Sequence, residues 1–307
     1  MYNEELKRRF IQQYTTKEGT ILMCESLFKE IEPHEQAWGM DICNRTQEEV
    51  AAVFNKTSGL REKYRLIKLN ALRDYISWCV ENDVPGANEC SGMLLPDNTD
   101  VLKNKTFRNP LHLQKFLDVV FDDEEKNTVD NTYRCYFWLA YGGALEDDIF
   151  DVRESDVDFE NMVVKCGGTE IPIYRESIKA FRKSIELRQF VYDHGIDVTT
   201  RERCPGDMLV RGLSDVKKTS IRKSISRRIK NALESGEIPM SISYKGVWLS
   251  GIFYRAYEAE VAGMPQDFRD FIEYLSIVSG KEFDGATIRR LRFDYLNDYN
   301  RWKETLK

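Results

Sequence analysis

The sequence predicts a mainly α-helical protein with one small β-hairpin, an α+β fold class, arranged in two domains. At 307 residues the chain is longer than a single hydrophobic core usually organises. Apolar residues recur at helical spacing along most of its length, whereas one segment around two adjacent glycines has the short apolar runs of strands. A stretch rich in Pro, Gly, Asn and Asp divides the chain and predicts a linker.

The first domain is expected to be helical and to span residues 1–90. Thr46 and Glu49 have the spacing of a capping box, which indicates a helix start. Apolar spacing predicts further helices at 4–14, 22–31 and 61–82.

The second domain is expected to span residues 109–307, after a linker at 91–108. Its strands are predicted within 157–174, where Gly167 and Gly168 are typical of a hairpin turn. The rest of the domain is predicted to be helical, at 110–121, 128–142, 176–193, 215–234, 247–262, 267–278 and 285–304.

Composition narrows the classes of function. The net charge of −6 argues weakly against nucleic acid, although only the face near the phosphates has to be positive. The seven cysteines are scattered without a CxxC pair, so we expect reduced thiols, no metal and no cofactor. No apolar run is long enough for a bilayer, and the N-terminus has no signal-peptide core, so we expect a cytoplasmic protein without membrane contact.

The strongest candidate site is the basic segment 217–230, KKTSIRKSISRRIK, which holds seven basic residues and no acidic one. Isoleucines at helical spacing form its apolar stripe. A solvated helix face usually mixes both signs of charge, so this segment favours double-stranded DNA over mere solubility. The predicted DNA-binding residues here are Lys218, Arg222, Lys223, Arg227, Arg228 and Lys230.

A second basic group lies on the helix predicted at 61–82. Arg61, Arg65 and Lys68 line one side of it and flank the apolar stripe. We expect them to contact DNA as well, with plain solubility as an equally good interpretation.

The segment YGGALEDDIFDVRESDVDF at 141–159 resembles the first catalytic motif of tyrosine recombinases, the phage-integrase family. The order of a helical domain, a linker and helices around a hairpin resembles that family over most of the chain. The resemblance implies a tyrosine-recombinase-like two-domain architecture. In the family an arginine of this motif holds the scissile phosphate, and Leu145 stands at its position here.

The later motifs are altered too. Lys165 matches the family's hairpin lysine, which protonates the leaving oxygen, and it is also a predicted DNA contact. In GVWLSGIFYRAYEAEVAG at 246–263, the resemblance puts Val247 at a histidine, Ser250 at the second arginine and Gly251 after it. Arg255, displaced from that position, is expected to be structural.

The nucleophile of the family is a tyrosine near the C-terminus. Tyr295 and Tyr299 are the candidates, although tyrosines at this spacing more often belong to a core. Without both arginines and the histidine, no plausible route to phosphoryl transfer remains, so we expect no catalytic residue and no enzyme.

The segments LSGIFYRAYE and MYNEELKRRF resemble the integrase-fold repressors that keep Bacillus prophages dormant. This resemblance implies a DNA-binding repressor of the lytic cycle. Two alternatives stay open: an active recombinase or integrase with atypical catalytic residues, and a protein–protein interaction scaffold.

The C-terminal segment 285–307 is predicted to be a long amphipathic helix, too apolar on one side to lie free in water. It is expected to dock on its own domain or on a second copy of the chain. A homo-oligomer formed in this way would support cooperative binding to paired DNA sites.

Overall fold

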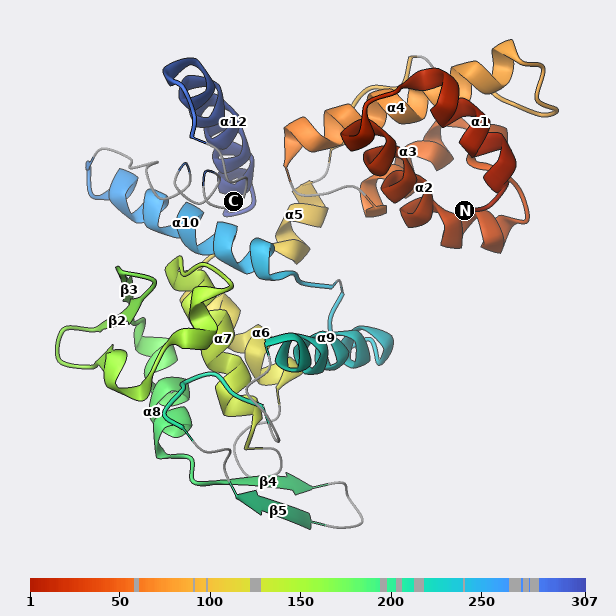
Figure 1. Cartoon of the computed structure of the whole chain (residues 1–307). Coiled ribbons are helices and arrows are strands. Elements are labelled where there is room, and N and C mark those ends of the chain that lie inside the picture. The colour runs from red at the N-terminus through yellow and green to blue at the C-terminus, as the bar shows by residue number, and fades with distance from the viewer. Residues whose placement is uncertain are drawn as a thin grey trace. The chain divides into compact units, whose positions relative to one another are not determined.

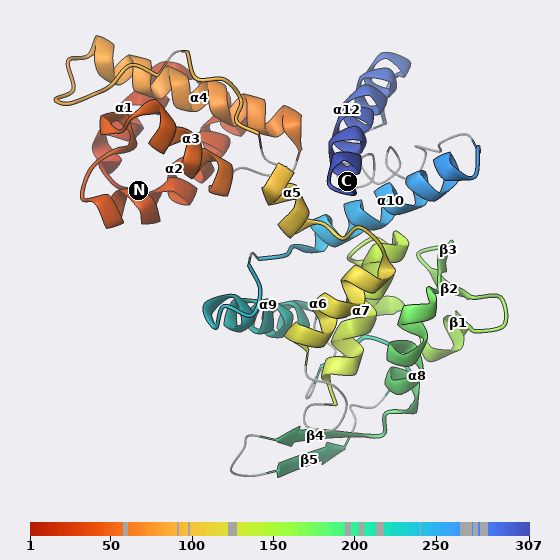
Figure 2. The same cartoon turned by 180° about the vertical axis from the view of Figure 1, so that it is seen from behind.

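The computed structural model describes residues 1–57, 61–90, 92–97, 99–121, 128–193, 198–202, 206–212, 218–239, 241–264, 272, 276 and 282–307. The chain divides into two compact units. The first comprises residues 1–102 and 293–301, and the second comprises residues 103–292 and 302–307. Figures 1 and 2 show the elements from opposite sides.

The first unit is helical in its described parts. Its core is aromatic: Tyr75 meets Phe28 and Phe10 edge-on, with ring centroids 4.9 and 5.2 Å apart. Edge-to-face rings add stabilisation beyond the area that they bury. The elements are α1 (Glu4–Tyr14), α2 (Glu18–Trp38), the 3-10 turn η1 (Ile42–Asn44), α3 (Gln47–Thr57), α4 (Glu62–Glu81) and the first part of α5 (Thr99–Lys105).

A buried ionic group joins several of these elements. The ammonium of Lys7 in α1 contacts the carboxylate of Glu35 in α2 and lies 3.7 Å from that of Asp41. Asp41 also accepts a hydrogen bond from the Tyr75 hydroxyl at 3.0 Å. Burial raises the pKa of Glu35, and the Lys7 charge opposes that shift. Since removing either partner would leave a buried charge unpaired, this group fixes one arrangement of the helices.

The predicted capping box is confirmed at the start of α3. The backbone N–H of Thr46 donates to Glu49 Oε2 at 3.1 Å, and the backbone N–H of Glu49 donates to Thr46 Oγ1 at 3.3 Å. Two backbone donors at the helix start are therefore satisfied by side chains.

The second unit is built around α7 (Asp130–Gly142), in which every residue is buried. Helix α10 (Tyr244–Val261) and helix α8 (Ile178–Glu186) pack against α7. The other helical elements of the unit are α6 (Pro110–Val120), η2 (Asp148–Asp151), η3 (Glu154–Asp156), η4 (Arg175–Ser177) and α9 (Lys218–Glu234).

The predicted hairpin is confirmed. Strands β1 (Val157–Asp158), β2 (Val163–Cys166) and β3 (Thr169–Pro172) form an antiparallel sheet in that order, with Lys165 opposite Glu170. Gly167 and Gly168 form its turn with φ of 57° and 79°, a backbone region in which glycine meets no Cβ clash.

One predicted helix, 176–193, is wrong in its second half. Helix α8 ends at Glu186, and residues 189–193 form strand β4 (Gln189–Asp193), which pairs antiparallel with β5 (Val198–Glu202). The sequence QFVYD is rich in residues that favour strands, and pairing with β5 overrides the helical spacing. The helix predicted at 267–278 falls almost wholly outside the described residues.

The C-terminal helix is confirmed as α12 (Gly285–Glu304), and Asp284 caps its start by accepting from the backbone N–H of Thr287 at 2.7 Å. The mainly helical α+β class predicted from the sequence is therefore the class observed.

Candidate nucleic-acid interface

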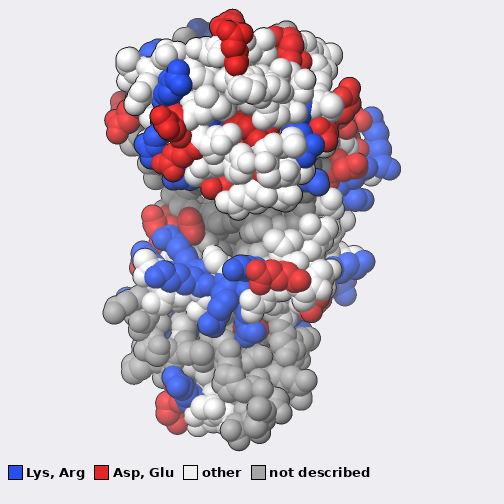
Figure 3. Space-filling view, turned by 90° about the vertical axis from the view of Figure 1, so that its right-hand side faces the viewer, with Lys and Arg blue, Asp and Glu red and all other residues white. Residues whose placement is uncertain are grey.

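Helix α9 has one buried face and one basic face. Ile221, Ile225, Ile229 and Ala232 are at most 6% exposed and belong to the core of the second unit. Between Lys218 and Leu233 the helix contains no acidic residue. Figure 3 shows Lys and Arg gathered in a band at the height of this helix. Such a face has the local positive charge that phosphates require.

The basic residues of α9 differ in their partners. Lys223 and Arg227 are exposed, and neither forms an ion pair with any described residue. Lys230 is 70% exposed and lies 3.5 Å from Glu234 on the same helix. Arg228 reaches inward and pairs at 3.1 Å with Asp130, which is fully buried. The middle of α9 therefore carries the cations most available to a ligand.

The first turns of α9 are neutralised by a neighbouring acidic segment. Lys218 Nζ lies 3.2 Å from Asp151 Oδ2, and Arg222 Nη2 lies 2.8 Å from Asp147 Oδ1. Arg222 Nε also lies 2.9 Å from Glu146 Oε1. Lys218 and Arg222 thus belong to the basic face but already hold carboxylate partners.

The basic group predicted on α4 is engaged within the first unit. Arg61 is 6% exposed and pairs with Asp298 at 2.8 Å. Arg65 is 1% exposed and donates to Asn55 Oδ1 and to the Pro96 carbonyl. Buried guanidinium groups with such partners are poorly placed to reach phosphates, so this surface does not support the DNA contact predicted for them.

Lys68, the third residue of that group, is less enclosed. Its ammonium lies 2.8 and 2.6 Å from the two carboxylate oxygens of Glu30 in α2. A cation held by both oxygens of one carboxylate is largely neutralised towards a further anion. Arg61, Arg65 and Lys68 therefore hold partners within the first unit, and the candidate DNA interface consists of the basic face of α9.

The positions that match the recombinase histidine and second arginine are enclosed in α10. Val247 and Ser250 are fully buried. The Ser250 hydroxyl donates to the Gly246 carbonyl at 2.6 Å and accepts from the backbone N–H of Phe107 at 2.9 Å. Ser250 is therefore a structural residue with its hydrogen bonds satisfied.

Gly251 marks a close approach of two helices. A Cβ added there would lie 1.7 Å from the backbone oxygen of Tyr141 in α7. Arg255, one turn later, donates to the same carbonyl at 2.9 Å. The guanidinium thus satisfies a carbonyl at the C-terminal end of α7, which is the structural role expected for it.

Lys165 lies at the rim of a cavity of about 350 Å³ in the second unit. The cavity is lined by three aspartates, Asp148, Asp151 and Asp156, beside this one lysine. Burial, followed by the charges of the three aspartates, raises the pKa of the Cys166 thiol to about 12. Three carboxylates beside one ammonium give the cavity lining a negative net charge, which disfavours a bound phosphate. Leu145, which stands at the position of the first catalytic arginine, is half-buried and carries no charge that could hold a phosphate.

The two candidate tyrosines lie inside the protein. Tyr295 and Tyr299 are 0% and 1% exposed, and their rings stack with centroids 6.5 Å apart. Both have the burial of core residues, the more frequent role of tyrosines at this spacing.

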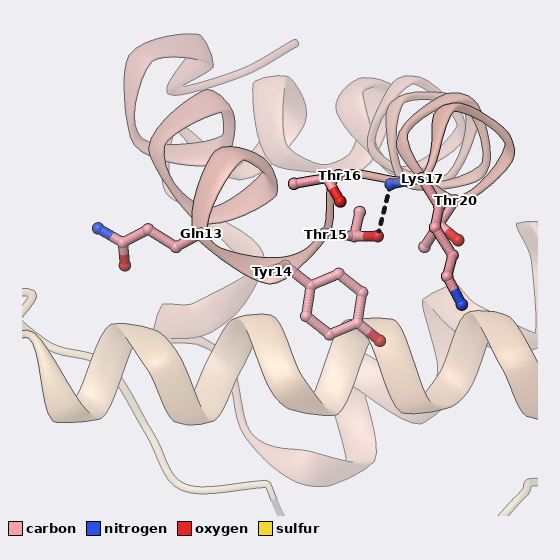
Figure 4. A pocket seen from close by; sticks show the side chains of 6 residues that line it. All are labelled: Gln13, Tyr14, Thr15, Thr16, Lys17 and Thr20. Atoms are coloured by element: carbon pink, nitrogen blue, oxygen red, sulfur yellow. Dashed lines mark hydrogen bonds between the residues drawn. The ribbon is translucent and has the colours of Figure 1, made fainter.

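A second cavity, of about 570 Å³, lies in the first unit and was not indicated by the sequence. Its lining is polar, and Figure 4 shows the Tyr14 ring lying along a neighbouring helix while Thr15 Oγ1 accepts from the backbone N–H of Lys17. Burial, with a hydrogen bond to Asp74, raises the pKa of Tyr14 to about 12. The lining residues are Gln13, Tyr14, Thr15, Thr16, Lys17 and Thr20.

No group of three or more His, Cys, Asp or Glu side chains within the described ranges could hold a metal ion. No helix in that part of the chain is both long and apolar enough to cross a bilayer.

Comparisons with known proteins give a match to the first unit. Residues 1–81 match the family model for the N-terminal core-binding domain of MrpR. No curated protein matches the chain.

Among solved structures, a XerA recombinase is similar at 12% identity and a TM-score of 0.40, over 95% of this chain and 98% of that one. The Tn1549 transposon integrase, in complex with circular intermediate DNA, is similar at 17% identity and a TM-score of 0.37, over 93% of each chain.

Proposed function

We propose that this protein is a DNA-binding regulator that neither cuts nor joins DNA. The observation that carries the proposal is the basic face of α9, on which Lys223 and Arg227 are exposed and unpaired among the described residues. Phosphate contacts supply most of the sequence-independent affinity of DNA-binding proteins, and exposed Lys and Arg on one helix face are suited to make them.

The proposal that catalysis is lost is supported by the motif positions. Ser250 is buried and hydrogen-bonded, and Gly251 has no room for a side chain. Lys165 lines a cavity together with three aspartates, where a recombinase would have to hold a phosphate. Because transition-state charge in phosphoryl transfer needs fixed cations, an acidic cavity opposes the reaction.

The finer proposal is a repressor of the prophage lytic cycle. It rests on the resemblance of LSGIFYRAYE and MYNEELKRRF to repressors with an integrase fold, together with the match of residues 1–81 to the MrpR core-binding domain. Paired DNA sites in a phage genome would be its target, with occupancy of these sites blocking transcription.

The DNA-binding proposal is tested by fluorescence anisotropy with a duplex of about 30 base pairs at several salt concentrations. Lys223→Glu and Arg227→Glu should each weaken binding and lower the slope of log affinity against log salt by about 0.9. The matched control is Arg175→Glu, an equal charge change at an exposed arginine on η4. Equal effects of all three variants would contradict an interface on α9, and a wild type that does not bind DNA would favour the interaction scaffold.

The absence of cutting is tested separately with a suicide substrate that traps a covalent phosphotyrosine. We expect no trapped product from the wild type and no nicking of supercoiled DNA. Nicking that disappears in Tyr295→Phe or Tyr299→Phe would instead establish an active recombinase with atypical residues.

A further inference from the structure

The acidic segment beside α9 acts on only one end of the basic face. Asp147 and Asp151 lie in the turn and the short helix η2 that follow α7, and their side chains are 81% and 70% exposed. They pair with Arg222 and Lys218, in the first two turns of α9. In the described part of the chain, Lys223 and Arg227 have no such carboxylate.

These ion pairs add little to stability, so their consequence lies elsewhere. Exposed pairs contribute about 0–1 kcal/mol, because water screens them and the side chains lose freedom. Their carboxylates nevertheless change the field that a phosphate would meet. A phosphate approaching Lys218 or Arg222 has to displace a carboxylate at 3.2 or 2.8 Å and leave that charge nearby.

We propose that Asp147 and Asp151 are specificity-determining residues, which mask Lys218 and Arg222 and thereby lower the sequence-independent affinity of α9 for DNA. This inference rests on the proposed DNA-binding function. The biologically relevant quantity for a regulator is the ratio of specific to non-specific binding, because non-specific sites vastly outnumber its target. Suppressing phosphate contacts at one end of the helix raises that ratio without altering the exposed side chains of its middle.

Glu146 also pairs with Arg222, but it is not changed in the experiment because it has a structural partner in α7. Its Oε1 accepts a hydrogen bond from the Tyr136 hydroxyl at 2.6 Å, so changing it would also disturb α7. Asp147 and Asp151 are mostly exposed and can be changed with little effect on the fold.

The experiment measures binding of a random-sequence duplex by the full chain between about 50 and about 200 mM salt. The double variant Asp147→Asn/Asp151→Asn frees Lys218 and leaves Arg222 with Glu146 as its carboxylate partner, so the salt slope should steepen by at least about 0.9, the value for one contact. When the salt is lowered from about 200 to about 50 mM, the affinity of the variant should therefore rise by at least about threefold relative to that of the wild type. The matched control is Glu160→Gln/Glu186→Gln, which makes the same charge change at two exposed glutamates that pair with no described residue of α9.

A second pair of variants identifies the cations that are released. Adding Lys218→Gln/Arg222→Gln to the aspartate variant should abolish the gain, whereas the same two changes alone should alter binding much less. A gain of equal size in the control, or a gain that survives the loss of both cations, would overturn the masking role. Absence of binding in every one of these proteins would instead overturn the proposed function, and circular dichroism verifies that each variant is folded.

Discussion

Gly251 shows how one residue decides whether a position can hold a functional side chain. Its Cα lies so close to α7 that an added Cβ would stand 1.7 Å from the Tyr141 oxygen. A histidine at this position would force α10 away from α7. The sequence placed Gly251 after the altered arginine position, whereas the packing shows why a side chain is excluded there.

We therefore predict that Gly251→Ala destabilises the protein by about 1–3 kcal/mol, the usual cost of overpacking a core. The measurement is the free energy of unfolding in urea. The control is Gly285→Ala at the start of α12, where nothing lies within 4 Å of an added Cβ. That change should be neutral or slightly stabilising, by less than about 1 kcal/mol. Equal losses in both variants would contradict the close approach.

His112 gives a prediction about pH. Burial lowers its pKa from 6.5, with a further effect of Arg108 and Lys115, and its Nδ1 accepts from the backbone N–H of Arg108 at 3.3 Å. Since the folded-state pKa lies below the unfolded value, the neutral imidazole contributes stability above pH 6.5 that is lost as the pH falls through the folded-state pKa.

The melting temperature of the wild type should therefore fall more steeply between about pH 7 and about pH 5 than that of His112→Gln. Parallel profiles for the two proteins would show that His112 does not titrate differently on folding. His34, whose pKa is also lowered by burial, is present in both proteins and does not affect the difference.

At the scale of elements, two basic helices that look alike in sequence behave differently. Charge patterning favoured DNA for α9 and left DNA and plain solubility as equal interpretations for α4, where the partners of Arg65 are Asn55 and Pro96, outside the helix. No periodicity within one helix can reveal such partners. The apolar stripe of α9 was predictable because its isoleucines recur at helical spacing, and the structure buries all three.

The hairpin β4–β5 illustrates the same limit for secondary structure. Adjacent glycines in the turn made β2–β3 predictable, whereas the apolar residues of 189–193 also fit the helical spacing predicted from residue 176 onward. Their strand depends on pairing with residues 198–202, a contact that helical spacing cannot show.

The contrast between the two helices predicts opposite variant phenotypes. Arg65→Gln should cost about 1–3 kcal/mol of stability, because it replaces a buried guanidinium and removes the donor of two half-buried acceptors, and should keep the salt slope of DNA binding. Lys223→Gln should keep stability within about 0.5 kcal/mol and lower the slope by about 0.9. Urea unfolding and salt titrations measure both. A lower slope with unchanged stability in Arg65→Gln would restore α4 to the interface.

At the scale of the whole molecule, α12 contributes to both compact units. Residues 293–301 belong to the first unit, in which Asp298 pairs with Arg61. Residues 302–307 belong to the second, in which Trp302 lies 5.8 Å from the ring of Phe253. On the apolar side of this helix, Tyr295, Tyr299 and Trp302 are buried within the chain, and Ile288 and Leu291 are half-buried. This favours a role in its own core over docking on a second copy.

Two single variants and a truncation separate these roles. Tyr295→Ala removes a fully buried ring and should cost roughly 3–5 kcal/mol, whereas Phe293→Ala, at a residue that is 63% exposed, should leave stability nearly unchanged. Deleting residues 285–307 should lower the melting temperature and weaken binding to one-site and two-site DNA by the same factor, because the apolar residues that it removes complete this chain's own units. The opposite outcome is a Phe293→Ala variant that keeps its stability and its affinity for one-site DNA but loses cooperative binding to two-site DNA. That result would show that the exposed side of α12 joins two copies of the chain, because multivalent binding raises the occupancy of paired sites without new base contacts.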